Sequence, residues 1–122
     1  MNALPLQGIR IADFGQIIAI PYTAQMLAWL GAEVVLIETE QRLTTRIWPP
    51  FAEAEPGVNR SGGFNMVNSS KLSCTLNLRD PEGVELAKQI ISAGQFDLRQ
   101  FIDSRLIRVG VRDDKKALIR LR

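Results

Sequence analysis

The chain has 122 residues, of which 46% are hydrophobic and 23% are charged. This composition is typical of one soluble globular domain and excludes disorder throughout the chain. No apolar run approaches the roughly 18 residues of a membrane span, because Gln16, Gln25, Glu33 and Glu38 interrupt the most apolar stretch. The first residues also lack the basic segment of a secretory signal, so we expect a cytoplasmic protein that does not bind a membrane.

A single cysteine, Cys74, and the absence of histidine restrict the chemistry that the chain can perform. One thiol cannot form an internal disulfide bond. Without histidine, the chain has no base for Cys-His or Ser-His catalysis and no ligand set for a zinc finger. These classes of hydrolase and metal site are therefore excluded.

The net charge of +2 hides an asymmetry along the chain. Residues 1–98 carry seven Lys or Arg and ten Asp or Glu, whereas residues 99–122 carry eight and three. A basic segment can bind nucleic acid or another acidic surface. No base-reading module accompanies this charge, so nucleic acid is not the partner we expect.

The first 31 residues have the pattern of a strand followed by a helix. Residues 9–14 alternate in polarity and end at Gly15, which predicts a strand and a glycine turn. Residues 22–30 lie between Pro21 and Gly31, which predicts a helix with proline at its start and glycine after its end. The apolar residues at helical spacing are Met26, Leu27 and Leu30.

A second strand is predicted at residues 34–38, where a continuous apolar run is typical of a strand buried in a parallel sheet. Strand, helix and strand then form a βαβ unit of an α/β fold. In such a unit the two strands are parallel, and the turn at Phe14, Gly15 and Gln16 lies at the carboxyl edge of the sheet. Open α/β sheets bind their ligands at this edge.

The second half of the chain predicts one more strand and one more helix. Residues 39–70 are rich in proline and glycine and read as irregular. Residues 73–78 alternate as a strand, and a helix is expected at 81–93 because Asp80 can cap it and Pro81 can begin it. The apolar face of this helix would contain Val84, Leu86, Ala87, Ile90 and Ile91.

Three side chains are candidates for chemistry on their sequence position alone. Asp13 could serve as an acid, a base or a metal ligand, but an aspartate at the end of a strand more commonly binds N–H groups of the following turn. Cys74 alternates with leucines, which favours a small core residue over a nucleophile. Arg79 precedes a capped helix and either binds an anion beside the helix amides or is a simple surface arginine.

Several separated segments of the chain have the composition of known motifs. The segments are Pro5–Phe14, Ala19-x-Pro21, Leu30–Glu38, Thr45-Arg46-x-Trp48, Phe64-x-x-x-Asn68-x-x-Lys71-x-Ser73 and Leu76–Gly83. Together and in this order they resemble the N-terminal part of class III CoA-transferases, and the resemblance extends over roughly residues 4–97. This family includes the formyl-CoA:oxalate and carnitine CoA-transferases and is related to the α-methylacyl-CoA racemases.

The resemblance implies a Rossmann-like parallel sheet, the N-terminal and CoA-binding portion of a larger subunit that forms an interlocked homodimer. The substrates would be an acyl-CoA and a carboxylic acid, with no covalently bound cofactor and no metal. By resemblance, Ile18 and Ala19 approach CoA through their backbone atoms. The nucleotide would be lined by Leu76, Asn77, Leu78 and Arg79, with Arg79 at a phosphate.

The family transfers CoA through an anhydride on a catalytic aspartate, but no motif of this chain matches that segment. We therefore assign no catalytic residue and expect the chain to be inactive alone. At four positions the chain also departs from the family pattern. Ile20 replaces a glycine, Thr39 an arginine, Leu72 an arginine and Ile47 a glycine.

We expect residues 1–97 to form the CoA-binding portion and residues 98–122 to form a divergent basic tail. The change of charge and composition at one point is what a frameshifted reading frame would give, and a disordered tail is the other expectation. The alternative function is a non-enzymatic interaction module whose basic tail binds an acidic partner or nucleic acid.

Overall fold

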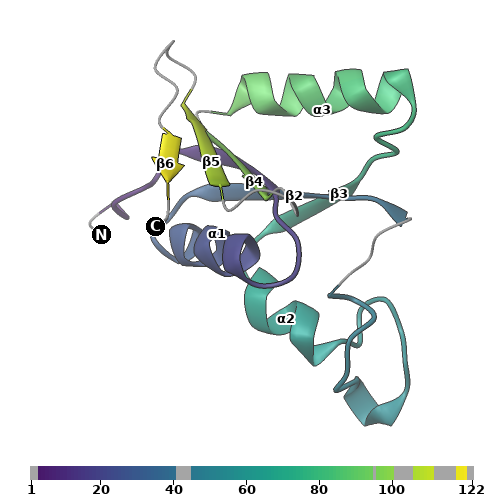
Figure 1. The fold of residues 1–122 in the computed structure, drawn as a ribbon. Helices are drawn as coiled ribbons and strands as arrows, with labels where there is room; N and C mark the ends of the chain where they lie inside the picture. The colour runs from purple at the N-terminus through teal and green to yellow at the C-terminus, as the bar shows by residue number, and fades with distance from the viewer. Residues whose placement is uncertain (1–2, 41–44, 95, 101–105, 112–117, 121–122) are drawn as a thin grey trace.

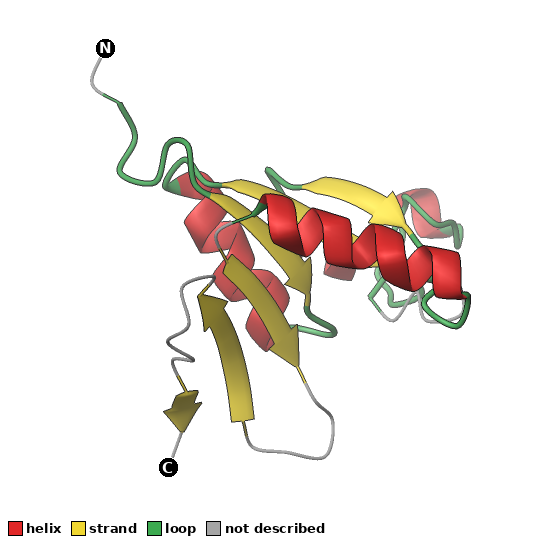
Figure 2. Ribbon diagram, turned by 90° about the horizontal axis from the view of Figure 1, so that it is seen from above, coloured by secondary structure: helices red, strands yellow, loops and turns green. Residues whose placement is uncertain are grey.

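One six-stranded sheet with helices on both faces forms the framework of the chain (Figures 1 and 2). The structure, a computed structural model, describes residues 3–40, 45–94, 96–100, 106–111 and 118–120, and it describes side chains up to residue 94. No helix within these ranges is both long and apolar enough to cross a membrane.

The sheet has the strand order β3-β2-β1-β4-β5-β6. β1 pairs in parallel with β2 and β4, and β2 pairs in parallel with β3. β5 is antiparallel to both β4 and β6. The strands are β1 (Arg10–Phe14), β2 (Glu33–Glu38), β3 (Leu72–Thr75), β4 (Phe96–Gln100), β5 (Leu106–Val111) and β6 (Leu118–Arg120).

The predicted βαβ unit is confirmed, because β1 and β2 are parallel and helix α1 (Ala19–Trp29) lies between them in sequence. Helix α2 (Gly62–Asn68) packs against α1 on the same face of the sheet, and helix α3 (Pro81–Ala93) covers the opposite face (Figure 1). The α/β fold class predicted from the sequence is therefore correct.

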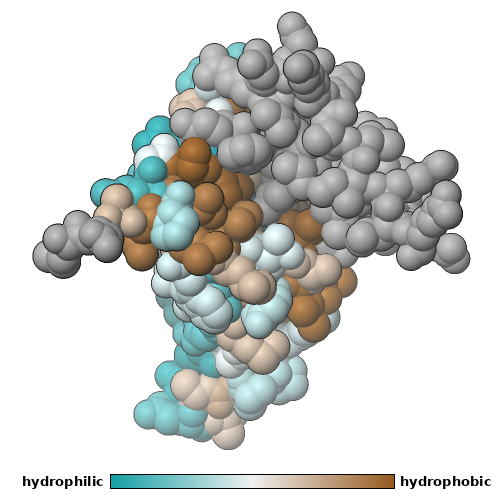
Figure 3. Space-filling model, turned by 90° about the vertical axis from the view of Figure 1, so that its left-hand side faces the viewer, coloured by the Kyte–Doolittle hydropathy of each residue, from teal (hydrophilic) through white to brown (hydrophobic). Residues whose placement is uncertain are grey.

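The buried face of α1 differs from the one that the periodicity predicted. Ile20 and Ala24 are buried, whereas Met26 and Leu30 are 49% and 45% exposed. The helix begins at Ala19, so Ile20, Ala24 and the half-buried Leu27 share the face that packs on the sheet. Apolar residues occupy both faces of this helix, and Figure 3 shows hydrophobic surface on the side of the molecule where α1 ends. Periodicity alone could not choose between them.

The core between α1 and the sheet is small and aliphatic. It is built from Ile11, Ile20, Ala24, Ala32 and Val34. On the other face of the sheet, α3 buries Ala87 and half-buries Ile90 and Ile91.

The expected irregular region at 39–70 contains α2 and a short 3₁₀ helix, η2 (Ala52–Ala54). The expectation was wrong for α2 because Gly62 and Gly63 have low helix propensity, while a cap and packing against α1 stabilise the helix. The cap is Ser61, whose Oγ accepts a hydrogen bond from the Phe64 N–H at 3.1 Å.

Strands β4, β5 and β6 were not predicted from the sequence. They fall in and next to the segment expected to be a divergent tail, and their backbones extend the sheet beyond β1. The side chains of this segment lie outside the described residues, so the boundary at residue 98 and the frameshift stay predictions.

Gly15, in the turn after β1, has no room for a side chain. An added Cβ would overlap Ile20 and lie 2.7 Å from Asp13 Oδ1. Gly15→Ala is therefore expected to lower the free energy of unfolding by about 2 kcal/mol, as overpacked sites do. Urea denaturation measures this cost. In an Ile20→Ala background the same substitution should cost less, because the Cγ2 methyl group of Ile20, the atom nearest to the added Cβ, is gone. Equal costs in both backgrounds would contradict this packing.

Candidate functional site

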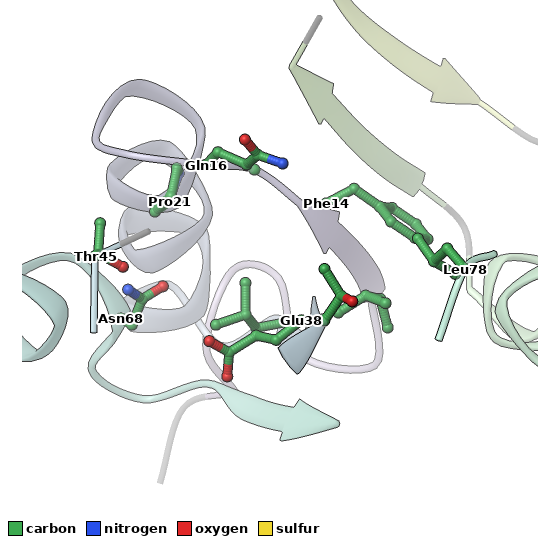
Figure 4. Close-up of a pocket in the computed structure, with 11 residues that line it drawn as sticks. Phe14, Gln16, Pro21, Glu38, Thr45, Asn68 and Leu78 are labelled. Carbon is green, nitrogen blue, oxygen red and sulfur yellow. The ribbon is translucent and has the colours of Figure 1, made fainter. Parts of the chain in front are cut away.

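A pocket of about 150 Å³ opens at the carboxyl ends of β1 and β2 (Figure 4). This is the edge of the sheet at which the sequence predicted a ligand site. In the view of Figure 4, Phe14 and Leu78 lie on one side of the pocket and Thr45 and Asn68 on the other. The pocket is lined by Phe14, Gly15, Gln16, Pro21, Leu36, Ile37, Glu38, Thr39, Thr45, Asn68 and Leu78.

Beneath this edge lies a buried ion pair between Asp13 and Lys71, whose side chains are 0% and 1% exposed. Lys71 Nζ donates to Asp13 Oδ2 at 2.8 Å, to the Pro21 carbonyl at 2.7 Å and to Asn68 Oδ1 at 2.8 Å. The other oxygen, Asp13 Oδ1, accepts a hydrogen bond from the Gly15 N–H at 2.7 Å. The predicted turn-binding role of Asp13 is thus confirmed, while its charged partner was not foreseen.

The environment of Lys71 weakens its hold on its proton. Burial lowers the pKa of the Lys71 ammonium below its usual value, and the charge and hydrogen bond of Asp13 and the charge of Glu38 oppose this shift. All three N–H donors of the ammonium have acceptors within the protein. This geometry suits a structural cation and leaves no donor for a ligand.

A second ion pair, between Glu38 and Arg46, borders the pocket at the end of β2. Arg46 binds the carboxylate with two parallel hydrogen bonds, from Nε at 2.8 Å and from Nη2 at 2.6 Å. Ser73 Oγ donates a third at 2.6 Å. Burial raises the pKa of Glu38, but these hydrogen bonds and the charges of Arg46 and Lys71 outweigh it and hold the pKa below its usual value.

Arg46 also fixes the segment that follows β2. Its Nη1 donates to the Val58 carbonyl at 3.0 Å and to Asn59 Oδ1 at 2.9 Å. Its guanidinium group lies 3.6 Å from the centre of the Phe64 ring, a cation–π contact. One side chain therefore ties the loop between β2 and α2 to the wall of the pocket.

Ile18 and Ala19, predicted to approach a ligand through their backbones, lie at the start of α1. Both are exposed, and Ala19 is the first residue of the helix. Neither lines the pocket, but Pro21 in the same first turn does. The structure therefore places this pair beside the pocket rather than inside it.

The other predicted segment, Leu76 to Arg79, forms the turn between β3 and α3. Leu78 lines the pocket, while Leu76 is half-buried and Arg79 is exposed. Asn77 organises this turn, because its Oδ1 accepts from the Arg79 N–H at 3.1 Å and its carbonyl accepts from the Asp80 N–H at 3.0 Å. These bonds end the strand earlier than the predicted residue 78.

In the first turn of α3, one of the free backbone N–H groups already has a protein hydrogen-bond acceptor. Asp80 caps it as predicted, since its Oδ1 accepts from the Glu82 N–H at 2.9 Å. The carboxylates of Asp80 and Glu82 both oppose a bound anion at this helix end. An anion here would depend on the Arg79 side chain more than on the helix amides.

The departures from the family pattern have different consequences in the fold. Ile20 is 1% exposed and packs in the core, so its side chain does not stand in the pocket as its position in sequence suggested. Thr39 lines the pocket, where an arginine would have supplied a cation. Leu72 and Ile47 are 60% and 67% exposed.

No functional role was predicted for the pocket residues Thr45 and Asn68 or for the cation Lys71. Each lies within a segment that resembles the family, and this resemblance was the sequence signal that could have pointed to a role. Cys74, expected in the core, is half-buried on the edge strand β3, and burial and the charge of Glu38 raise the pKa of its thiol. Within the described residues, no group of His, Cys, Asp and Glu could hold a metal ion.

Comparison with known proteins identifies one family. A family model described as CoA-transferase family III matches residues 6–117. The match continues past residue 97, where the resemblance noted in the sequence ends. A succinate–glutarate CoA-transferase of Agrobacterium fabrum is 34% identical over 88% of this chain and 28% of its own length. A formyl-CoA:oxalate CoA-transferase of Streptomyces coelicolor is 33% identical over 94% of this chain and 27% of its own.

A solved structure shares the fold. It is that of a CAIB/BAIF family protein from Brucella suis, with a TM-score of 0.69 and 29% identity over 79% of this chain and 25% of that protein. The chain thus spans about a quarter of the length of the proteins it matches.

The lowered pKa of Glu38 predicts a pH-dependent contribution to stability. Glu38→Gln should cost about 2 kcal/mol at pH 7, because the charged hydrogen bonds to Arg46 are lost. The carboxylate stabilises the fold above the usual glutamate pKa of about 4.3 and loses this effect as pH falls through its lowered value. Urea denaturation from pH 7 to pH 3 should therefore show the two proteins converging at acid pH. A constant difference would refute this, and Glu85→Gln, at an exposed pair, is the control.

Proposed function

We propose, since this chain belongs to CoA-transferase family III, that it is the CoA-binding part of an enzyme of this family. The reaction would transfer CoA between an acyl-CoA thioester and a carboxylic acid. The observation that carries the proposal is the position of the pocket. It lies at the carboxyl edge of the sheet, between the two segments that the family resemblance assigns to CoA, with Pro21 contributed from one side and Leu78 from the other.

The charge of the pocket suggests which part of CoA it takes. Among the described residues that line the pocket, Glu38 alone is charged, and the arginine that the family commonly has at position 39 is a threonine here. Arg46 already neutralises this carboxylate, so the lining offers a phosphate no free cation, whereas Phe14 and Leu78 offer apolar contact. We therefore place an uncharged portion of CoA in the pocket and a phosphate outside it, at Arg79.

The volume of the pocket agrees with a site that holds only part of CoA. Drug-sized ligands fill clefts of roughly 300–1,000 Å³, and this pocket holds about 150 Å³. The remaining contacts to CoA would come from a longer family subunit or from a partner chain. Binding to this chain alone should accordingly be weak.

The carboxylates beside the pocket are poor candidates for an anhydride-forming nucleophile. Both oxygens of Glu38 accept hydrogen bonds, and its lowered pKa makes it a weaker nucleophile. Asp13 is fully buried and bound to Lys71. The proposal is therefore a binding part without its own catalytic residue.

The relatives named above act on succinate, glutarate, oxalate or formyl-CoA by their names. Dicarboxylic acids are a fitting class of acceptor for the proposed reaction. The cytoplasmic location and the interlocked homodimer stay predictions. So does the alternative of an interaction module, which depends on tail side chains outside the described residues.

Titration calorimetry with CoA tests the proposed site. The wild-type chain should bind CoA weakly, and Arg79→Ala should lower the affinity about fivefold, since an exposed charged contact contributes about 1 kcal/mol. Lys88→Ala is the matched control, because it removes an exposed cation of α3 that does not line the pocket. It should leave the affinity unchanged. Equal affinities for the wild type and Arg79→Ala would remove Arg79 from the site.

An acyl-exchange assay on the same proteins tests the second half of the proposal. The wild-type chain should give no turnover above a buffer control. Clear turnover would show that a carboxylate of this chain is the nucleophile after all.

A further inference from the structure

The turn between β1 and α1 holds an unusual backbone conformation. Ile17 has a φ of 67°, in the left-handed region that β-branched residues strongly avoid. Such a conformation is strained and persists only where the surrounding structure holds it in place. This turn also supplies Gly15 and Gln16 to the pocket lining. Something must therefore hold a pocket wall in a conformation that it would not adopt alone.

The buried ion pair joins the two ends of this turn. Asp13, before the turn, binds the Gly15 N–H through Oδ1 and Lys71 through Oδ2. Lys71 reaches across to the carbonyl of Pro21, after the turn, and to Asn68 at the end of α2. One ammonium group thus fixes the entry and the exit of the strained turn and anchors both to a second helix.

We propose that Lys71 is the positioning residue of the pocket: it holds the turn from Phe14 to Pro21 so that its wall faces the ligand. The nature of that ligand as CoA rests on the function proposed above. Lys71 does not line the pocket, and all three N–H groups of its ammonium donate to protein acceptors. It therefore acts only through the residues that it binds.

Stability alone does not account for this arrangement. Replacing a buried ion pair by apolar side chains of similar volume is often neutral or stabilising, because two charges no longer have to be desolvated. An apolar pair cannot bind the Pro21 carbonyl of α1 and the side-chain oxygen of Asn68 in α2 at the same time. The lysine therefore determines the geometry of the turn.

Amide hydrogen exchange in the absence of any ligand tests this directly. The Gly15 N–H bonds to Asp13, and the Tyr22 N–H bonds to the Ile18 carbonyl at 2.8 Å, so both report on the turn. The Val84 N–H in the first turn of α3, bonded to the carbonyl of the capping residue Asp80, is the reference amide on the opposite face of the sheet. Lys71→Met should accelerate exchange at Gly15 and Tyr22 at least tenfold more than at Val84.

Val34→Ala is the matched control, since Val34 is a buried core residue of β2 outside the pocket lining. It should accelerate exchange at all three amides by a common factor. The same common factor in Lys71→Met would reduce Lys71 to a general stabiliser and overturn the proposal.

If the single variant Lys71→Met does not fold, the double variant Asp13→Asn with Lys71→Met provides the same test. It leaves no unpaired buried charge and keeps a side-chain oxygen for the Gly15 N–H. Relative to Val84, Tyr22 should then exchange at least tenfold faster than in the wild type, because no ammonium group binds the Pro21 carbonyl. Wild-type protection at Tyr22 would contradict the role of Lys71.

A CoA titration separates this proposal from the proposed function. If the wild type binds CoA, Lys71→Met should lose at least tenfold more affinity than Val34→Ala, and an equal affinity would overturn the link to the pocket. If the wild type does not bind CoA, the proposed function fails, and the exchange rates alone decide whether Lys71 positions the turn.

Discussion

The ammonium group of Lys71 lies where β1, α1 and α2 meet, and its charge constrains all three. A buried cation is tolerated only when acceptors surround it. Here they are Asp13, the Pro21 carbonyl and Asn68, so the end of the strand, the first turn of the helix and the end of α2 must be in place together. The pocket lies directly beside this junction, and its wall at Gly15 is held by the same carboxylate.

The Glu38–Arg46 pair does the equivalent work at the end of β2. It ties the loop after β2 to the sheet and uses both oxygens of the carboxylate that borders the pocket. In both ion pairs, the charged side chains beside the pocket bind protein groups and so hold the pocket walls in place. This use of the charges supports the proposal that the pocket binds a ligand without supplying a nucleophile. This agrees with a chain that matches about a quarter of a family III subunit.

Local patterns in the sequence predicted the parts of the fold that depend on neighbouring residues. The strand at residues 34–38, the cap at Asp80 and the turn-binding role of Asp13 all follow from local chemistry. The partner of Asp13 could not be predicted, because Lys71 is 58 residues away in sequence. The buried face of α1 was also out of reach, since both of its faces are apolar and only packing selects Ile20 over Met26. Helix α2 was not predicted because Gly62 and Gly63 at its start have low helix propensity, although Ser61 before them caps the helix.

The site itself was predicted in part. Leu78 and the turn at Phe14 to Gln16 line the pocket. The other residues predicted to contact CoA lie outside its lining, and their role in binding stays a prediction: Ile18, Ala19, Leu76, Asn77 and Arg79. The most direct test of the central claim is a map of backbone amide chemical shifts during a titration of the wild-type chain with CoA. Shifts should concentrate at residues 14–19 and 76–79, at the carboxyl edge of the sheet. Shifts confined to the opposite edge, at Gly8, Gly31 and Glu33, would contradict a CoA site in this pocket.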